Sequence, residues 1–335
     1  MSRLPWPLVF QVVGVVAALW LIVHAWQIWV LAFISLIVAA AILPAARFGE
    51  RYRVPRGATV LLVYVAVGAV LALMGRLLWP ALVEQWGQFM EHLPRLFDNV
   101  RQWLGHLDVV LGRWGTALPQ PQPENLQGLG GALLANTLQV TAGVVGFVVG
   151  LLAIIVIAAY VVMDGEKIGH TLLRLVPPGY RTRVAALGPP VLDRIGGYVR
   201  GQIASSLGVG LVLTIGLAIL GVRYALLIGA LAAVLNVVPF VGSLVAAVLG
   251  ILSALNESLG LAVGTALLFW GTNLLEAKVL APQFVGRATG LHPLAVLLAL
   301  LAGAHLGGLI GALVAVPFVA ALWEVVRHLA LDRRA

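Results

Sequence analysis

The chain has 335 residues, of which 61% are hydrophobic and only 10% are charged. A soluble domain is nearer to 45–50% apolar, so this composition excludes a soluble globular protein. It predicts an all-α, polytopic membrane protein with about eight spans. The formal charge of +8 fits basic residues that flank spans, so it does not indicate a nucleic-acid partner. The absence of cysteine excludes disulfides and thiolate metal sites.

Long apolar runs predict the spans, and polar segments separate them. The runs lie near residues 7–23, 28–46, 57–79, 138–163, 202–222, 224–256, 258–275 and 289–326. They suggest four regions, which are N-terminal membrane helices at 1–79, extracytoplasmic amphipathic helices with a connector at 80–137, a fourth span with a cytoplasmic amphipathic segment at 138–201, and a core of broken hairpins at 202–335.

The basic residues predict the orientation of these spans. When the spans alternate, most of the 21 basic residues fall on one side of the membrane. The other side receives Arg76, Arg95, Arg101, Arg113 and Arg223. The positive-inside rule then predicts that both termini are cytoplasmic and that residues 80–130 are extracytoplasmic.

The segment 80–118 carries an apolar stripe with a period of about 3.5 residues, which predicts amphipathic helices. We expect a helix pair that is broken at Pro94. The stripe either packs against a neighbouring subunit or lies on the membrane interface. Its members are Leu82, Trp86, Phe89, Leu93, Leu96, Val100, Trp103, Leu107, Val110 and Trp114.

The run 224–256 is interrupted near its middle by polar and helix-breaking residues. Each apolar arm has about a dozen residues, short of the roughly 20 that a spanning helix needs. Pro239 removes one backbone N–H and Gly242 permits a turn, which predicts a re-entrant hairpin or a discontinuous helix. Asn236 and Ser243 either bond the freed backbone groups or lie on a solute path.

A second interrupted region lies near the C-terminus, and its predicted breaks are at Gly307, Gly308, Gly311 and Pro317. Broken helices survive in a bilayer only inside protein or beside a cavity, and they are typical of transport sites. The sequence Val-Pro-Phe-Val at 238–241 recurs at 316–319. Whether this repeat reflects an internal duplication stays open.

Glu276 is the most informative polar residue, because carboxylates at membrane depth are costly and usually functional. It lies three residues after Asn273, which predicts that both share one helical face. It is the only deep carboxylate that we expect. The alternative is an interfacial glutamate that pairs with Lys278 or Arg287.

Other polar residues extend the list of candidates for a substrate path. Gln202 opens the fifth span with Ser205 and Ser206, where the three either line a path or bond between helices. His305 lies in the last broken region and is either a path residue or structural. The chain has no GxSxG, HExxH or P-loop sequence, so we expect no enzyme, no cofactor and no metal site.

The second half resembles the autoinducer-2 exporter family of bacterial membrane proteins. The resemblance rests on the order and spacing of several short pieces, which are Asp164, Tyr198–Gln202, Val238–Gly242, the run from Glu276 through Pro282 and Gly286 to Pro293, Gly307–Gly311 and Ala315–Pro317. The first half is similar only in its layout of three spans before an extracytoplasmic region.

The resemblance implies a multi-span transporter of the bacterial inner membrane that assembles as a homopentamer. Members of the family are linked to export of autoinducer-2 (AI-2), and others to sodium/proton antiport. The leading hypothesis is export of a small polar solute through the core at 202–335. The alternatives are an antiporter that uses Glu276 and a membrane scaffold that works through residues 80–118. Expected partners are a small polar solute or ion, the lipid bilayer and further copies of the chain.

Overall fold

The computed structural model describes residues 13–14, 20, 24–111, 137–239, 241–286 and 290–331. These residues form helices and turns without a strand, which confirms the all-α expectation. Among them, six helices are long and apolar enough to cross a membrane, and two shorter apolar helices accompany them. Most of the predicted first span at 7–23 and much of the connector before residue 137 lie outside the described residues.

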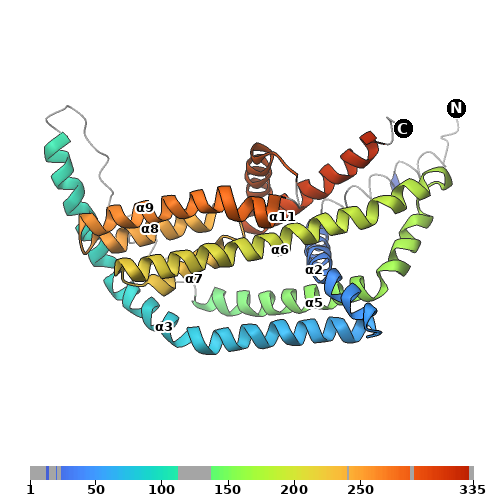
Figure 1. The fold of residues 1–335 in the computed structure, drawn as a ribbon, viewed down its shortest axis with the longest axis horizontal. Helices are drawn as coiled ribbons and strands as arrows, with labels where there is room; N and C mark the ends of the chain where they lie inside the picture. The colour runs from blue at the N-terminus through green and yellow to red at the C-terminus, as the bar shows by residue number, and fades with distance from the viewer. Residues whose placement is uncertain are drawn as a thin grey trace, which may run out of the picture. The chain divides into compact units, whose positions relative to one another are not determined.

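Figure 1 shows the helices in chain order. They are α2 (Trp26–Arg51), α3 (Arg56–Leu111), α5 (Thr137–Arg174), the 3-10 turn η2 (Pro178–Tyr180), α6 (Arg181–Leu220), α7 (Ala225–Leu235), α8 (Val241–Leu255), α9 (Leu259–Leu275), the π-helix η3 (Glu276–Gly286) and α11 (Pro293–Leu331). Two compact units result. Unit 1 comprises residues 1–60, 145–196 and 314–335, and unit 2 comprises residues 61–144 and 197–313.

Helix α3 corrects the predicted break at Pro94, because it continues as one helix of 56 residues from Arg56 to Leu111. A proline removes one N–H and displaces one carbonyl. In a helix of this length, with an apolar period that continues past Pro94, the neighbouring turns keep the chain helical. Of the predicted stripe, Phe89 is buried and Trp86 is exposed. The side chains from Leu93 to Trp114 lie outside the described ones.

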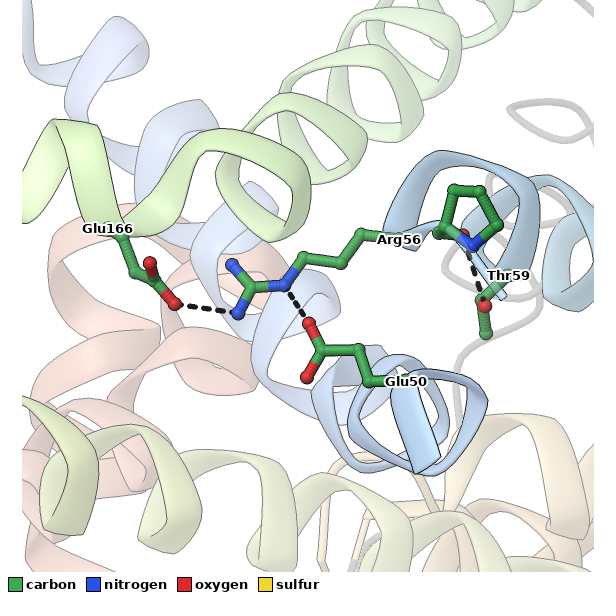
Figure 2. Close-up of polar contacts among 5 residues, drawn as sticks. Glu50, Arg56, Thr59 and Glu166 are labelled. Atoms are coloured by element: carbon green, nitrogen blue, oxygen red, sulfur yellow. Dashed lines mark hydrogen bonds and ion pairs between the residues drawn. The ribbon is translucent and has the colours of Figure 1, made fainter. Parts of the chain in front are cut away.

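A charged cluster joins three helices of unit 1. Arg56, at the start of α3, donates to Glu50 near the end of α2 and to Glu166 of α5, with 2.6 Å between its Nη2 and Oε1 of Glu166. Figure 2 shows the Arg56 guanidinium between the two carboxylates. The neighbouring turn is tight, since a Cβ on Gly49 would overlap the side chain of Thr59. The ion pairs and the close packing therefore hold the connection between α2 and α3 in place.

Further ion pairs of unit 1 connect α2 with α6 and α6 with α11. Arg47 contacts Asp193, with 3.0 Å between Nη1 and Oδ1, and both side chains are exposed. The adjacent Arg194 lies 2.5 Å from Oε2 of Glu324, whose side chain is only 2% exposed. Arg327 donates to Oε1 of the same carboxylate at 2.8 Å. Glu324 is thus buried between two arginines.

Glu324 also corrects the expectation that Glu276 is the only deep carboxylate. It lies within a candidate span, Leu294–His328, and is almost fully buried. The two guanidinium groups offset the cost of burying this charge. Arg327 donates a hydrogen bond to Oε1, whereas Arg194 forms an ion pair with Oε2, which has no hydrogen-bond partner among the described residues.

Unit 2 has an apolar core to which five helices contribute. Helix α7 packs on α8, and α8 lies beside α9. Helices α6 and α7 approach closely, since a Cβ on Gly210 would lie 2.9 Å from the carbonyl oxygen of Gly229. The buried members of the core are Phe89, Val209, Leu213, Leu217, Val222, Tyr224, Ile228, Ala232, Ala246, Ala254, Ala262 and Phe269.

Candidate functional site

The apolar run at 224–256 forms two short helices joined by a tight turn. Helix α7 has 11 residues and α8 has 15, and each is shorter than the roughly 20 residues needed to cross a bilayer. Asn236 caps the end of α7. The turn needs glycine at 242, because a Cβ there would overlap the backbone nitrogen of Asn236 and lie 2.6 Å from its Cα.

Asn236 is the centre of a buried polar cluster in unit 2. Its side chain is 0% exposed, and its Nδ2 donates to Oε1 of Glu276 at 2.7 Å. Its backbone oxygen accepts a hydrogen bond from Nε2 of Gln202 at 2.6 Å. Its Oδ1 has no hydrogen-bond partner in the described part of the chain. Three predicted path residues, from α6, the α7–α8 turn and η3, therefore meet at one place.

Gln202 has a clear structural task in this cluster. The last carbonyls of a helix have no partner within the helix, and Gln202 provides one for the end of α7 from the neighbouring helix α6. Ser205 and Ser206 follow on α6 and are also buried. Among the described residues, the hydroxyl of Ser206 has no hydrogen-bond partner. This region of α6 thus carries buried polar side chains in addition to Gln202, which bonds the backbone at the end of α7.

Glu276 lies where the helix changes character. The α-helical part, α9, ends at Leu275, and the π-helix η3 begins at Glu276. π-Helical segments are rare and occur frequently at functional sites. Within the described residues Glu276 makes no ion pair, and Lys278 is exposed; Arg287 lies outside them. Among the described residues, the carboxylate is therefore held by the amide of Asn236 and not by a cation.

The remaining candidates are placed differently. Ser243 is buried in the first turn of α8, and Pro239 is half-buried in the turn before it. Asn273 and His305 are exposed, and within the described part of the chain neither forms a hydrogen bond with Asn236, Gln202 or Glu276. Asn273 is exposed and Glu276 is half-buried, although the backbone N–H of Glu276 still bonds to the last turn of α9.

A second break lies within α11. Gly307 (φ −142°, ψ 21°) and Gly308 (φ 59°, ψ −142°) depart from helical geometry. The conformation of Gly308 favours glycine, because L side chains rarely adopt it. A Cβ on Gly311 would overlap the carbonyl oxygen of Gly303. Pro317, by contrast, is buried inside a part of α11 that continues as a helix.

Comparison with known proteins decides the family. A family model described as "AI-2E family transporter" matches residues 8–331. The chain belongs to the AI-2E transporter family. The resemblance noted in the second half is confirmed and extends over nearly the whole chain. The chain is thus a membrane transport protein with multiple apolar helices.

Several relatives of this AI-2E family member share most of its length. YrrI of Bacillus subtilis, which is named for transport, is 27% identical over 322 residues, or 92% of this chain and 88% of YrrI. MT0215 of Mycobacterium tuberculosis, also named for transport, is 29% identical over 321 residues, or 94% and 86% of the two chains. The AI-2 transport protein TqsA of Escherichia coli is 28% identical over 310 residues, or 90% and 85%.

Two polar contacts of this AI-2E protein were not predicted from the sequence. Glu324 was visible in the sequence, because it is a carboxylate inside the apolar run 289–326. Glu276 was selected on the same ground, since it directly follows the apolar run 258–275. Its partner Arg194 lies 130 positions earlier in the chain, and no local pattern connects them. Gln85 of α3 accepts a hydrogen bond from the backbone N–H of Leu227, and a lone glutamine in an amphipathic segment gives no signal of that contact.

Proposed function

We propose that this protein is a secondary transporter that exports a small polar solute, AI-2 or a molecule like it, across the bacterial inner membrane. The observation that carries the proposal is Asn236. It is fully buried at a break between two half-length helices, its amide is bound to Glu276, and its side-chain oxygen has no partner within the described residues.

The chemistry of this cluster suits a solute that donates hydrogen bonds. Buried polar groups are normally satisfied, and an unpaired buried oxygen costs about 1–3 kcal/mol. A hydroxyl of a bound solute would pair with Oδ1 of Asn236 and remove that cost. Broken helices near the middle of the membrane are the usual place for such sites. Glu276 would orient the Asn236 amide and accept a further hydrogen bond with its second oxygen.

The two broken helices supply the movement in this proposal. The α7–α8 turn at Pro239 and Gly242 and the distortion of α11 at Gly307 and Gly308 are places where backbone angles change with little steric cost. We place the hinges there and at Gly311. Pro317 has no hinge role in this proposal, because the helix continues through it.

Location and assembly are part of the same proposal. The asymmetric distribution of basic residues supports cytoplasmic termini. A homo-oligomer, a pentamer by the family resemblance, would cover the apolar stripe that begins at Leu82. Native mass spectrometry of the detergent-solubilised protein measures the number of subunits and so tests this assembly. A monomer at all protein concentrations would contradict it.

One observation favours a second candidate function, sodium/proton antiport. Glu276 is held without a cationic partner among the described residues, so a sodium ion or a proton could neutralise it. Glu276 is half-buried, and carboxylates within membrane segments are often ion or proton sites in transporters.

A flux experiment separates the two functions. We would reconstitute the protein in proteoliposomes and measure AI-2 flux and sodium-dependent proton flux for Asn236→Ala and Glu276→Gln. AI-2 export predicts that Asn236→Ala loses AI-2 flux and that Glu276→Gln, which keeps an acceptor oxygen, retains more of it. Antiport predicts the reverse order in proton flux. Asn273→Ala is the matched control, because that asparagine is exposed outside the cluster. Normal flux in both variants would contradict both functions.

A further inference from the structure

Helix α7 begins without a cap of its own. Its N-cap residue is Tyr224, which has a left-handed backbone (φ 62°, ψ 25°) and makes no side-chain cap hydrogen bond. The first N–H groups of a helix have no partner within it. A helix of 11 residues is also too short to be stable alone. The start of α7 therefore depends on neighbouring elements.

Helix α3 provides the missing cap. The backbone N–H of Leu227 donates to Oε1 of Gln85 at 2.9 Å. One turn further along α3, the ring of Phe89 meets the ring of Tyr224 edge to face, with 5.5 Å between centroids. Both rings are buried, at 4% and 7% exposure. Gln85 and Phe89 lie four residues apart and so share a face of α3.

A weaker set of contacts holds the same turn from α8. The hydroxyl of Ser253 donates to the carbonyl of Arg223 at 3.4 Å. The guanidinium of Arg223 lies 3.4 Å from Glu257. These groups bind residue 223, before α7 begins, whereas Gln85 binds an N–H of α7 itself. Within the described residues, Gln85 is thus the side chain that binds an N–H at the start of α7.

The opposite end of α7 is Asn236. The helix is roughly 16 Å long at 1.5 Å per residue, and a single short helix moves as a rigid rod. A displacement of its start is therefore passed to its end, where the Asn236 amide meets Glu276. We propose that Gln85 is a positioning residue that caps α7 from α3 and so sets the position of Asn236 in the solute site. This inference rests on the proposed function.

The test compares three variants of the full-length protein in proteoliposomes, with AI-2 as the probe. Gln85→Leu removes the acceptor, and Gln85→Glu keeps it. Gln88→Leu is the matched control, because Gln88 is an exposed glutamine on the same helix, and its side chain donates a hydrogen bond to Glu84, its one side-chain partner among the described residues. For Gln85→Leu we expect KM for AI-2 to rise about fivefold, the factor for one hydrogen bond, with a smaller change in the maximal rate. Gln85→Glu should restore KM, and Gln88→Leu should leave it unchanged.

Hydrogen–deuterium exchange of the peptide that contains Leu227 gives a readout that needs no solute. It should become faster in Gln85→Leu and stay normal in the other two variants. Unchanged exchange would overturn the cap, and faster exchange with a normal KM would overturn the positioning role. A loss of maximal rate with a normal KM would also overturn it, since that indicates only damaged protein. Failure of the proposed function itself would appear separately, as normal AI-2 flux in Asn236→Ala.

Discussion

At the scale of single residues, the ion pairs of unit 1 differ greatly in energetic weight. Arg47 and Asp193 are both about half exposed, and such pairs contribute about 0–1 kcal/mol. Glu324 is 2% exposed and binds Arg194, which is 13% exposed, as well as Arg327. Removing one partner from a buried pair costs about 3–5 kcal/mol, because the other charge stays behind without compensation.

We therefore expect Glu324→Gln to destabilise the protein by several kcal/mol and Asp193→Asn to have little effect. The two changes have the same chemistry, since each replaces a carboxylate by its amide, so they differ only in burial and in partners. Thermal unfolding of both variants in the same detergent measures the difference. Equal melting temperatures would show that the Glu324 cluster contributes no more than a surface pair.

At the scale of elements, the α7–α8 hairpin depends on one backbone approach. The space beside Gly242 is filled by the backbone of Asn236 and Leu235, and backbone cannot rotate away as a flexible side chain would. A methyl group at this position must open the turn. The hydrogen bond from Asn236 to Glu276 starts from the same turn and would be lost if the turn opened.

Gly242→Ala should consequently lower transport strongly and speed hydrogen exchange in α7 and α8. Gly260→Ala in α9 is the control, because no atom lies within 4 Å of a Cβ added there. In a helix that change should stabilise by about 0.5–1 kcal/mol. Equal transport by the two variants would mean that the turn tolerates a wider form.

The two Val-Pro-Phe-Val sequences show how far elements can be predicted from sequence. At 239 the proline follows an asparagine cap and precedes Gly242, and the chain turns. At 317 the same four residues are followed by Ala320 and Ala321, which favour helix, and α11 continues. Composition and apolar runs thus predict the helices. Asn236, Gln202 and Glu276 were predicted as candidates because polar groups in apolar runs need partners. Their meeting depends on packing between α6, the turn and η3, which no local pattern contains.

At the scale of the whole molecule, the positive-inside rule predicts on which side of the membrane the ion pairs of unit 1 lie. Arg47, Arg56, Arg194 and Arg327 all take part in ion pairs of that unit. We therefore predict a cytoplasmic position for these arginines and an extracytoplasmic position for residues 80–130.

Cysteine labelling in intact cells tests this orientation, because the natural chain has no cysteine. A cysteine at Gln120 should react with a membrane-impermeant reagent from outside the cell. A cysteine at Arg183 should react only after the membrane is opened. Labelling of both positions from the same side would contradict the predicted topology.

The left-handed backbone of Tyr224 has a consequence for how firmly α7 is held. A non-glycine residue in this conformation costs about 1–2 kcal/mol. The edge-to-face ring contact with Phe89 contributes about 0.5–1.5 kcal/mol, and the Gln85 hydrogen bond about 1 kcal/mol. The contacts with Phe89 and Gln85 stabilise the start of α7 by about as much as the Tyr224 backbone strain destabilises it. The attachment of α7 to α3 therefore has a small net free energy. Detachment of α7 from α3 would release the backbone strain at Tyr224. A small change in α3 or in α7 would therefore decide whether the two helices stay attached.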